Sequence, residues 1–99
     1  MTDKVLLATV SARPRFPIGC LVITRNALDL LNEAEVSQGL SRHFTGDWGN
    51  VPVDDQQCNE DALIHGDRLL SAYGEGERRF WIITEADRSA TTILMPDDY

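Results

Sequence analysis

The stretch 40–50, LSRHFTGDWGN, gathers residue types that enzymes and binding sites use most often. Arg42 precedes His43, and Asp47 and Trp48 follow between two glycines. A histidine titrates near neutral pH and can move protons, and an adjacent arginine can hold an anion. The same residues also suit a structural corner, in which Trp48 closes the edge of the core and Asp47 binds backbone amides. We favour the corner for Trp48 and leave the role of His43 open.

A second cluster lies at 81–92, WIITEADRSATT, where Glu85, Asp87 and Arg88 occupy an expected hairpin tip and Thr91 begins the next strand. Carboxylates at such a tip could act as acid or base. Pairs at surface turns are more often structural, because an Asp side chain closes the turn. We therefore interpret the tip as a turn in which Arg88 pairs with Glu85 or Asp87, a contact that contributes little when exposed.

Six acids and no lysine or arginine occupy residues 47–67. Four of them, Asp54, Asp55, Glu60 and Asp61, lack the spacing of an EF-hand calcium loop. No P-loop, dinucleotide-binding, serine-hydrolase or zinc-protease motif occurs in the sequence. We therefore predict a solvated acidic helix that also carries Asn59, with no metal site and no cofactor.

The charge of the chain constrains its partners. The formal net charge is −7, and residues 1–15 alone carry +2, so residues 16–99 carry −9. A negative field of this size repels a phosphate backbone, which disfavours general nucleic-acid binding. It suits a protein partner with a basic surface, and the carboxylates could stand where phosphates would sit in a nucleic-acid-binding cleft.

Composition indicates an ordinary globular domain, with 42% hydrophobic and 25% charged residues. No apolar run approaches the roughly 18 residues of a membrane span, and the N-terminus lacks the pattern of a signal peptide. We expect a cytoplasmic protein without membrane contact. Cys20 and Cys58 lack zinc-ligand spacing. Two buried thiols are the favoured interpretation, and a disulfide stays open.

The first half of the chain predicts a strand followed by helices. Residues 1–15 read as an extended or partly ordered lead-in, and IGCLVIT at 18–24 is a β-branched run of strand length. Thr24 can cap a helix over RNALDLLNEAEVS, whose apolar residues fall on one face. Ser37 can cap a second short helical piece that ends at Gly46. The stretch 37–53 is then long for a connection within a compact domain, and such loops are often functional.

The second half predicts one more helix and three strands. Asp54 or Asp55 opens a helix that runs to His65, with Gly66 as its stop. DRLLSAY, RRFWIIT and SATTILM are strand-like runs separated by turn residues. The expected fold is α+β, with order β-α-α-β-β-β. Two helices cover one face of a C-terminal three-stranded antiparallel meander, and an N-terminal strand is added. Residues 16–99 form the single domain.

Four stretches of the sequence stand out together: ARPRFPIGCLVIT followed by AL, RHFTGDWG, NEDAL followed by GDRLLSAY, and WIITEADRSATTILMPDDY. They resemble motifs of small, uncharacterised, plasmid-related bacterial proteins, and the resemblance covers roughly residues 16–99. It implies a complete protein of a mobile-element group, and it supplies no mechanism. Residues 1–15 lie outside the resemblance.

The order of motifs also resembles, more loosely, that of barnase-like ribonucleases. This resemblance implies metal-independent RNA cleavage through a cyclic phosphate, with His43 as acid/base. Arg68 or Arg88 would hold the scissile phosphate, and Glu85 would be the second acid or base. Tyr73 and either Thr91 or Thr92 would line the sheet face.

These observations lead to three functional hypotheses. The leading one is a small acidic accessory protein that binds a basic protein partner, as a nucleic-acid mimic or inhibitor. The alternative is the ribonuclease with His43 at its centre. A third is a subunit that docks into a larger complex, with the stretch 40–50 as a structural staple. The oligomeric state stays open.

Overall fold

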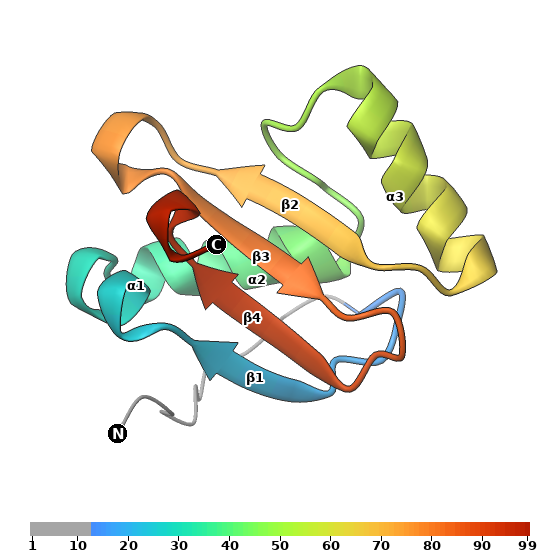
Figure 1. The fold of residues 1–99 in the computed structure, drawn as a ribbon, viewed down its shortest axis with the longest axis horizontal. Helices are drawn as coiled ribbons and strands as arrows, with labels where there is room; N and C mark the ends of the chain where they lie inside the picture. Colours follow the sequence, from blue (N-terminus) through green and yellow to red (C-terminus); the bar gives the residue numbers. More distant parts are fainter. Residues whose placement is uncertain (1–12) are drawn as a thin grey trace.

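Residues 13–99 are described by this computed structural model, and they form an α+β fold of three α-helices and one sheet of four strands (Figure 1). Most of the predicted lead-in, residues 1–12, lies outside the described residues. The helices and strands are β1 (Cys20–Ile23), α1 (Arg25–Leu30), α2 (Glu33–Phe44), α3 (Val53–His65), β2 (Leu69–Tyr73), β3 (Phe80–Thr84) and β4 (Ala90–Leu94), with two 3₁₀ turns, η1 (Gly76–Arg78) and η2 (Pro96–Asp98).

The sheet is mixed, with strand order β1-β4-β3-β2. The three C-terminal strands pair antiparallel as predicted, with Ser71 opposite Ile82 and Ile82 opposite Ile93. β1 lies beside β4 and runs parallel to it. The sheet is therefore not purely antiparallel. A parallel neighbour needs a crossover connection, and everything between β1 and β4 supplies it.

The prediction of two helices in the fold is wrong, because the described part of the chain, residues 13–99, forms three. The expected long helix after Thr24 breaks at Leu31, which is extended with ψ 149°. Asn32 then caps α2 through the amide of Glu35, whose side chain accepts from the Asn32 amide. Ser37 consequently lies inside α2 and caps nothing. The helical piece predicted to end at Gly46 is the C-terminal part of α2, so the connection between α2 and α3 is shorter than the stretch 37–53.

Local signals placed the start of α1 and the end of α3 correctly. The Thr24 hydroxyl accepts from the Ala27 amide. Gly66 adopts the left-handed conformation, with φ 76°, immediately after His65. This conformation suits glycine because it has no Cβ.

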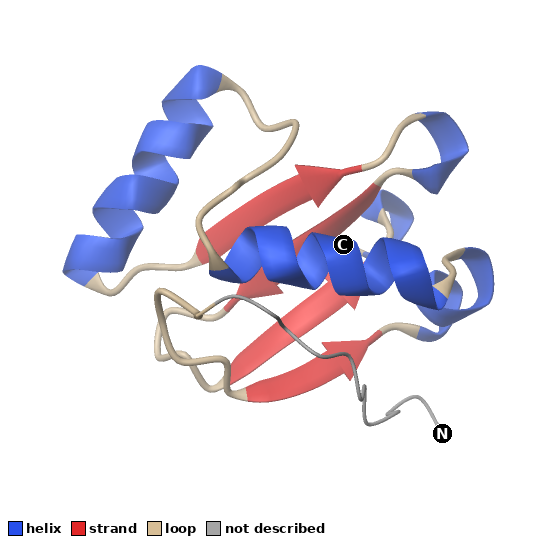
Figure 2. Ribbon diagram, turned by 180° about the vertical axis from the view of Figure 1, so that it is seen from behind, coloured by secondary structure: helices blue, strands red, loops and turns tan. Residues whose placement is uncertain are grey.

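The helices do not cover the sheet equally. α2 lies across one face (Figure 2), where Leu40 and Phe44 are fully buried. The helix approaches closely at Gly39, since a Cβ there would lie 2.9 Å from the Phe80 ring. α3 instead lies beside β2 at the edge of the sheet. One helix thus forms the main core, and the other leaves most of its surface to solvent.

The prediction of two buried thiols is wrong, because both cysteines are exposed and free. Cys20 alternates with Leu21 and Ile23 on β1, so its side chain leaves the sheet on the face opposite α2. Cys58 lies in an exposed run of α3. An apolar pattern alone did not reveal which face of each element was covered.

Candidate functional site

His43 lies at the centre of a buried network of hydrogen bonds beneath α2. Its side chain is 0% exposed. Nδ1 lies 2.5 Å from Ser71 Oγ, and Nε2 lies 2.9 Å from Thr84 Oγ1. Thr84 Oγ1 is 2.8 Å from Thr91 Oγ1, which donates to the Ile18 carbonyl at 2.9 Å. The network therefore joins α2 to three strands and to the segment before β1.

The Thr91 hydroxyl at one end of the network determines which group donates in each of its hydrogen bonds. Thr91 donates its only hydroxyl proton to the Ile18 carbonyl, so Thr84 must donate to Thr91. Thr84 then has no proton left for His43, so Nε2 carries one and donates it. Nδ1 is the acceptor, and the Ser71 hydroxyl donates to it. His43 is therefore the neutral imidazole protonated at Nε2.

Burial opposes any charge on this imidazole. Burial is the main reason that the pKa of His43 is lowered to about 3, and the nearby charge of Arg88 contributes to the same shift. The rings of Phe16, Phe44 and Trp48 lie within 5.8 Å of the imidazole, centroid to centroid. At neutral pH the side chain is thus uncharged and enclosed. An acid/base catalyst needs access to its substrate, and this geometry offers none.

The stretch 46–50 forms an added edge beside β2. Gly49 and Ala72 make a parallel bridge, in which Ala72 donates to the Trp48 carbonyl at 3.2 Å and accepts from the Asn50 amide at 2.7 Å. Only glycine fits at position 49, because a Cβ would lie 2.0 Å from the Ala72 carbonyl oxygen. Trp48 is buried at 4% exposure, and its Nε1 donates to Glu60 at 2.9 Å.

Arg42 and Asp47 close the outside of the same corner. Arg42 Nε donates to Asp47 Oδ2 at 2.8 Å, and the hydrogen bond from Arg42 is the main reason that the pKa of Asp47 is lowered. The Asp47 carbonyl accepts from the Tyr73 hydroxyl at 2.7 Å. Burial raises the pKa of Tyr73 above its ordinary value. Tyr73 faces α2 together with Ser71, and Arg42 contacts its ring rather than an open pocket.

Arg88 connects the β3–β4 turn to the end of α3 through side-chain hydrogen bonds. The prediction that it pairs with Glu85 or Asp87 through their carboxylates is wrong. Its guanidinium donates instead to the backbone carbonyls of Asp67 at 2.6 Å, Ala62 at 3.1 Å and Glu85 at 3.0 Å. A cation at the C-terminus of a helix is also favoured by the helix dipole. Asp87 closes the turn by accepting from the Ser89 amide at 3.0 Å.

Asn59 protects the other half of the β2 edge. Its side chain accepts from the Leu70 amide at 3.1 Å and donates to the Leu70 carbonyl at 2.8 Å. An unpaired strand edge invites pairing with another chain. The outward backbone groups of Leu70 and Ala72 are therefore satisfied by α3 and by the stretch 46–50.

The residues expected to form a ribonuclease site do not share one cavity. Arg68 lies one position before Leu69 and donates to the exposed Tyr99 hydroxyl at 2.9 Å. Glu85 is exposed at the turn, and Thr92 is half-buried on the face of β4 opposite Thr91. Thr91 reaches His43 only through Thr84. This geometry does not favour the ribonuclease hypothesis, which stays a prediction.

Two surfaces are candidates for binding a partner. The first is the outer side of α3, where Asp54, Asp55 and Asp61 are exposed and Asp61 accepts a hydrogen bond from Gln57 Nε2 at 3.1 Å. Among residues 13–99 the ion pairs join Arg15 to Glu60, Arg42 to Asp47, and Arg78 to Glu35, so none involves these three aspartates. Sequence reasoning recognised this helix as acidic and interpreted it as a solvated face.

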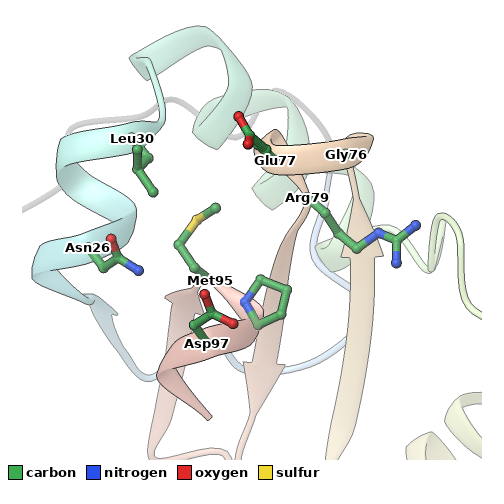
Figure 3. A pocket seen from close by; sticks show the side chains of 8 residues that line it. Asn26, Leu30, Gly76, Glu77, Arg79, Met95 and Asp97 are labelled. Atoms are coloured by element: carbon green, nitrogen blue, oxygen red, sulfur yellow. The ribbon is translucent and has the colours of Figure 1, made fainter.

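The second surface is a groove of about 450 Å³ between α1, η1 and η2 (Figure 3). Its lining includes Leu30 and Met95 as apolar groups and Glu77 and Asp97 as carboxylates. Sequence reasoning missed it, because its residues come from three distant segments that were read as a helix, a turn and a tail. No spacing signal in the sequence connects them.

The described residues contain no group of three or more His, Cys, Asp or Glu side chains placed to hold a metal. Within the same part of the chain, no helix has the length and hydropathy to cross a bilayer. Comparisons of the chain with protein-family models, with curated proteins and with solved structures give no match. Fold and surface together define a small acidic α+β protein whose motif residues are mostly committed to packing. The two family resemblances stay predictions.

Proposed function

We propose that this chain is a small acidic interaction protein that binds a basic protein partner through the outer side of α3. The observation behind the proposal is that exposed carboxylates and exposed apolar residues occur together on one helix. Asp54 and Asp61 lie seven residues apart, hence on one side of α3. Val53 and Ile64, near the two ends of the helix, are each 78% exposed.

This combination is typical of a binding surface. Unpaired carboxylates attract a basic partner and speed its approach. Exposed apolar side chains gain free energy when a partner covers them, at roughly 25 cal/mol per Å² of apolar surface. In its finer form, the proposal is that the carboxylates occupy a cleft built for nucleic-acid phosphates, so that the chain inhibits its partner. A mobile-element setting would suit that role.

Affinity capture from a cell lysate tests the proposal. The immobilised chain should retain basic proteins at low salt and release them as salt screens the charges. A variant with Asp54→Asn, Asp55→Asn and Asp61→Asn should retain at least about tenfold less, since three lost charge contacts together amount to more than ~1.4 kcal/mol.

A matched control neutralises three exposed acids elsewhere, with Asp29→Asn, Glu33→Gln and Glu75→Gln. It changes the net charge equally and should keep most of the capture. Equal losses in both variants would show that only net charge matters. Capture that is insensitive to salt would overturn the electrostatic account altogether.

A further inference from the structure

The groove lies at the end of the sheet where β1 and β4 finish. β1 leads directly into α1, β4 leads into η2, and η1 joins β2 to β3 at the same end (Figure 1). Residues from these three connections line it, although they lie far apart in the sequence. Its volume of about 450 Å³ falls within the usual range for ligand sites.

The carboxylates around the groove differ in whether they form hydrogen bonds within the fold. Asp98, just outside the lining, accepts from Thr24 Oγ1 at 2.6 Å, from the Met95 amide at 2.9 Å and from Asn26 Nδ2 at 3.3 Å. These contacts hold η2 against α1. Glu77 and Asp97 are exposed and have no hydrogen-bond or ion-pair partner among residues 13–99.

The side chains converge on the space between them. Figure 3 shows Leu30 and Met95 extending into the groove from opposite sides, with Glu77 and Asp97 on its rim. Leu30 is 48% exposed, so the groove presents apolar surface to solvent. Arg79 also lines it, but its guanidinium points away from the other side chains (Figure 3). The groove thus combines an apolar floor with two rim carboxylates that have no ion-pair partner among residues 13–99.

We propose that this groove holds an arginine side chain of the partner, an inference that rests on the proposed function. The aliphatic stem of an arginine would lie against Leu30 and Met95. Its planar guanidinium presents five donors, which suits hydrogen bonding to rim carboxylates such as Glu77 or Asp97. A lysine offers a compact point charge without this planar array of donors. An anionic ligand would be repelled, so charge complementarity selects a cationic side chain.

The inference is tested with a probe small enough to occupy the groove alone. N-acetyl-arginine amide is titrated into the chain while the Met95 methyl signal is followed by NMR. We expect a saturable shift. The citrulline analogue, which has nearly the same shape without the charge, should bind at least tenfold more weakly. Glu77→Gln with Asp97→Asn should weaken arginine binding at least tenfold.

A matched variant separates the groove from the acidic helix. Asp54→Asn with Asp55→Asn makes the same charge change on α3 and should leave the arginine titration unchanged within twofold. No Met95 shift, an equal shift with citrulline, or equal losses in both double variants would overturn the inference. If the groove binds arginine but the α3 variant captures protein normally, the proposed α3 contact fails and the groove stands. If capture depends on α3 and the probe leaves Met95 unmoved, the groove alone fails.

Discussion

The polar groups around His43 and those on the outer side of α3 differ in what they bind. Every polar atom of the His43 side chain has an internal partner, and described buried side chains leave no nitrogen or oxygen unpaired. Asp54 and Asp55 on α3 face solvent and take part in none of the ion pairs among residues 13–99. The conspicuous motif is thus used to fold the chain, whereas plain surface acids are left available for a partner.

A physical rule explains the difference. A buried donor or acceptor without a partner costs about 1–3 kcal/mol, so an interior histidine must be surrounded by matching groups. Exposed carboxylates carry no such requirement, because water solvates them. Residue type alone therefore says little about function until burial is known. Substitutions in the two regions should differ sharply in their effect on stability.

Replacement of His43 should have the largest effect. His43→Ala opens a cavity and leaves Ser71 and Thr84 without a partner, so we expect the free energy of unfolding to fall by about 3–5 kcal/mol. Urea denaturation followed by tryptophan fluorescence measures it. The exposed His65 supplies the control, and His65→Ala should cost less than about 1 kcal/mol. Similar values for both variants would contradict the structural role of the network.

Asn59 should come next. Asn59→Ala leaves the Leu70 amide and carbonyl without their side-chain partner, and we expect a loss of about 2–3 kcal/mol in unfolding free energy. Gln57→Ala, on the exposed side of the same helix, should change little. Light scattering adds a second readout, since a bare β2 edge invites association. If the Asn59 variant is as stable as the Gln57 variant, the edge does not depend on this side chain.

The depressed pKa of His43 predicts a loss of stability in mild acid. The unfolded chain binds a proton below the ordinary value of 6.5, whereas the folded chain resists it until about pH 3. The contribution is therefore complete above pH 6.5 and declines as the pH falls toward 3. Between pH 6.5 and 5 the loss should reach about 2 kcal/mol. His43→Gln, compared by urea denaturation across this range, should lack that slope, and an unchanged slope would refute the assignment.

The smallest effect should come from the exposed Arg42–Asp47 pair. The two side chains are 48% and 54% exposed, so solvent screens their attraction. Arg42→Ala should lower the unfolding free energy by less than about 1 kcal/mol, measured under the same conditions as the other variants. A loss above about 2 kcal/mol would place Arg42 with His43 among the residues on which the corner depends.

Much of the fold could be predicted from local patterns. The three C-terminal strands lie within DRLLSAY, RRFWIIT and SATTILM, and Gly66 ends α3 at His65. The break between α1 and α2 was missed, although Asn32 and Glu35 carry the spacing of a capping box. The apolar face continues across the break, so hydrophobic periodicity favoured one helix.

The candidate sites were less predictable. Trp48 and Arg88 attracted attention by type, yet both bind other parts of the chain. Thr84, which joins His43 to Thr91, was not singled out. The signal was weak, because it is a polar residue at a position of β3 that shares a face with buried apolar residues. The groove had no signal, since Leu30, Glu77 and Asp97 meet only after folding.

The sequence by itself determined the three C-terminal strands, the start of α1, the end of α3 and the strongly negative charge of residues 16–99, because these depend on neighbouring residues and on counting. Only the tertiary structure decided that β1 pairs parallel with β4, that His43 is enclosed and that Glu77 and Asp97 line one groove. Such facts arise from contacts between residues distant along the chain. Strand pairing, burial and side-chain pKa all depend on which distant residues become neighbours on folding, and a local sequence pattern does not show this.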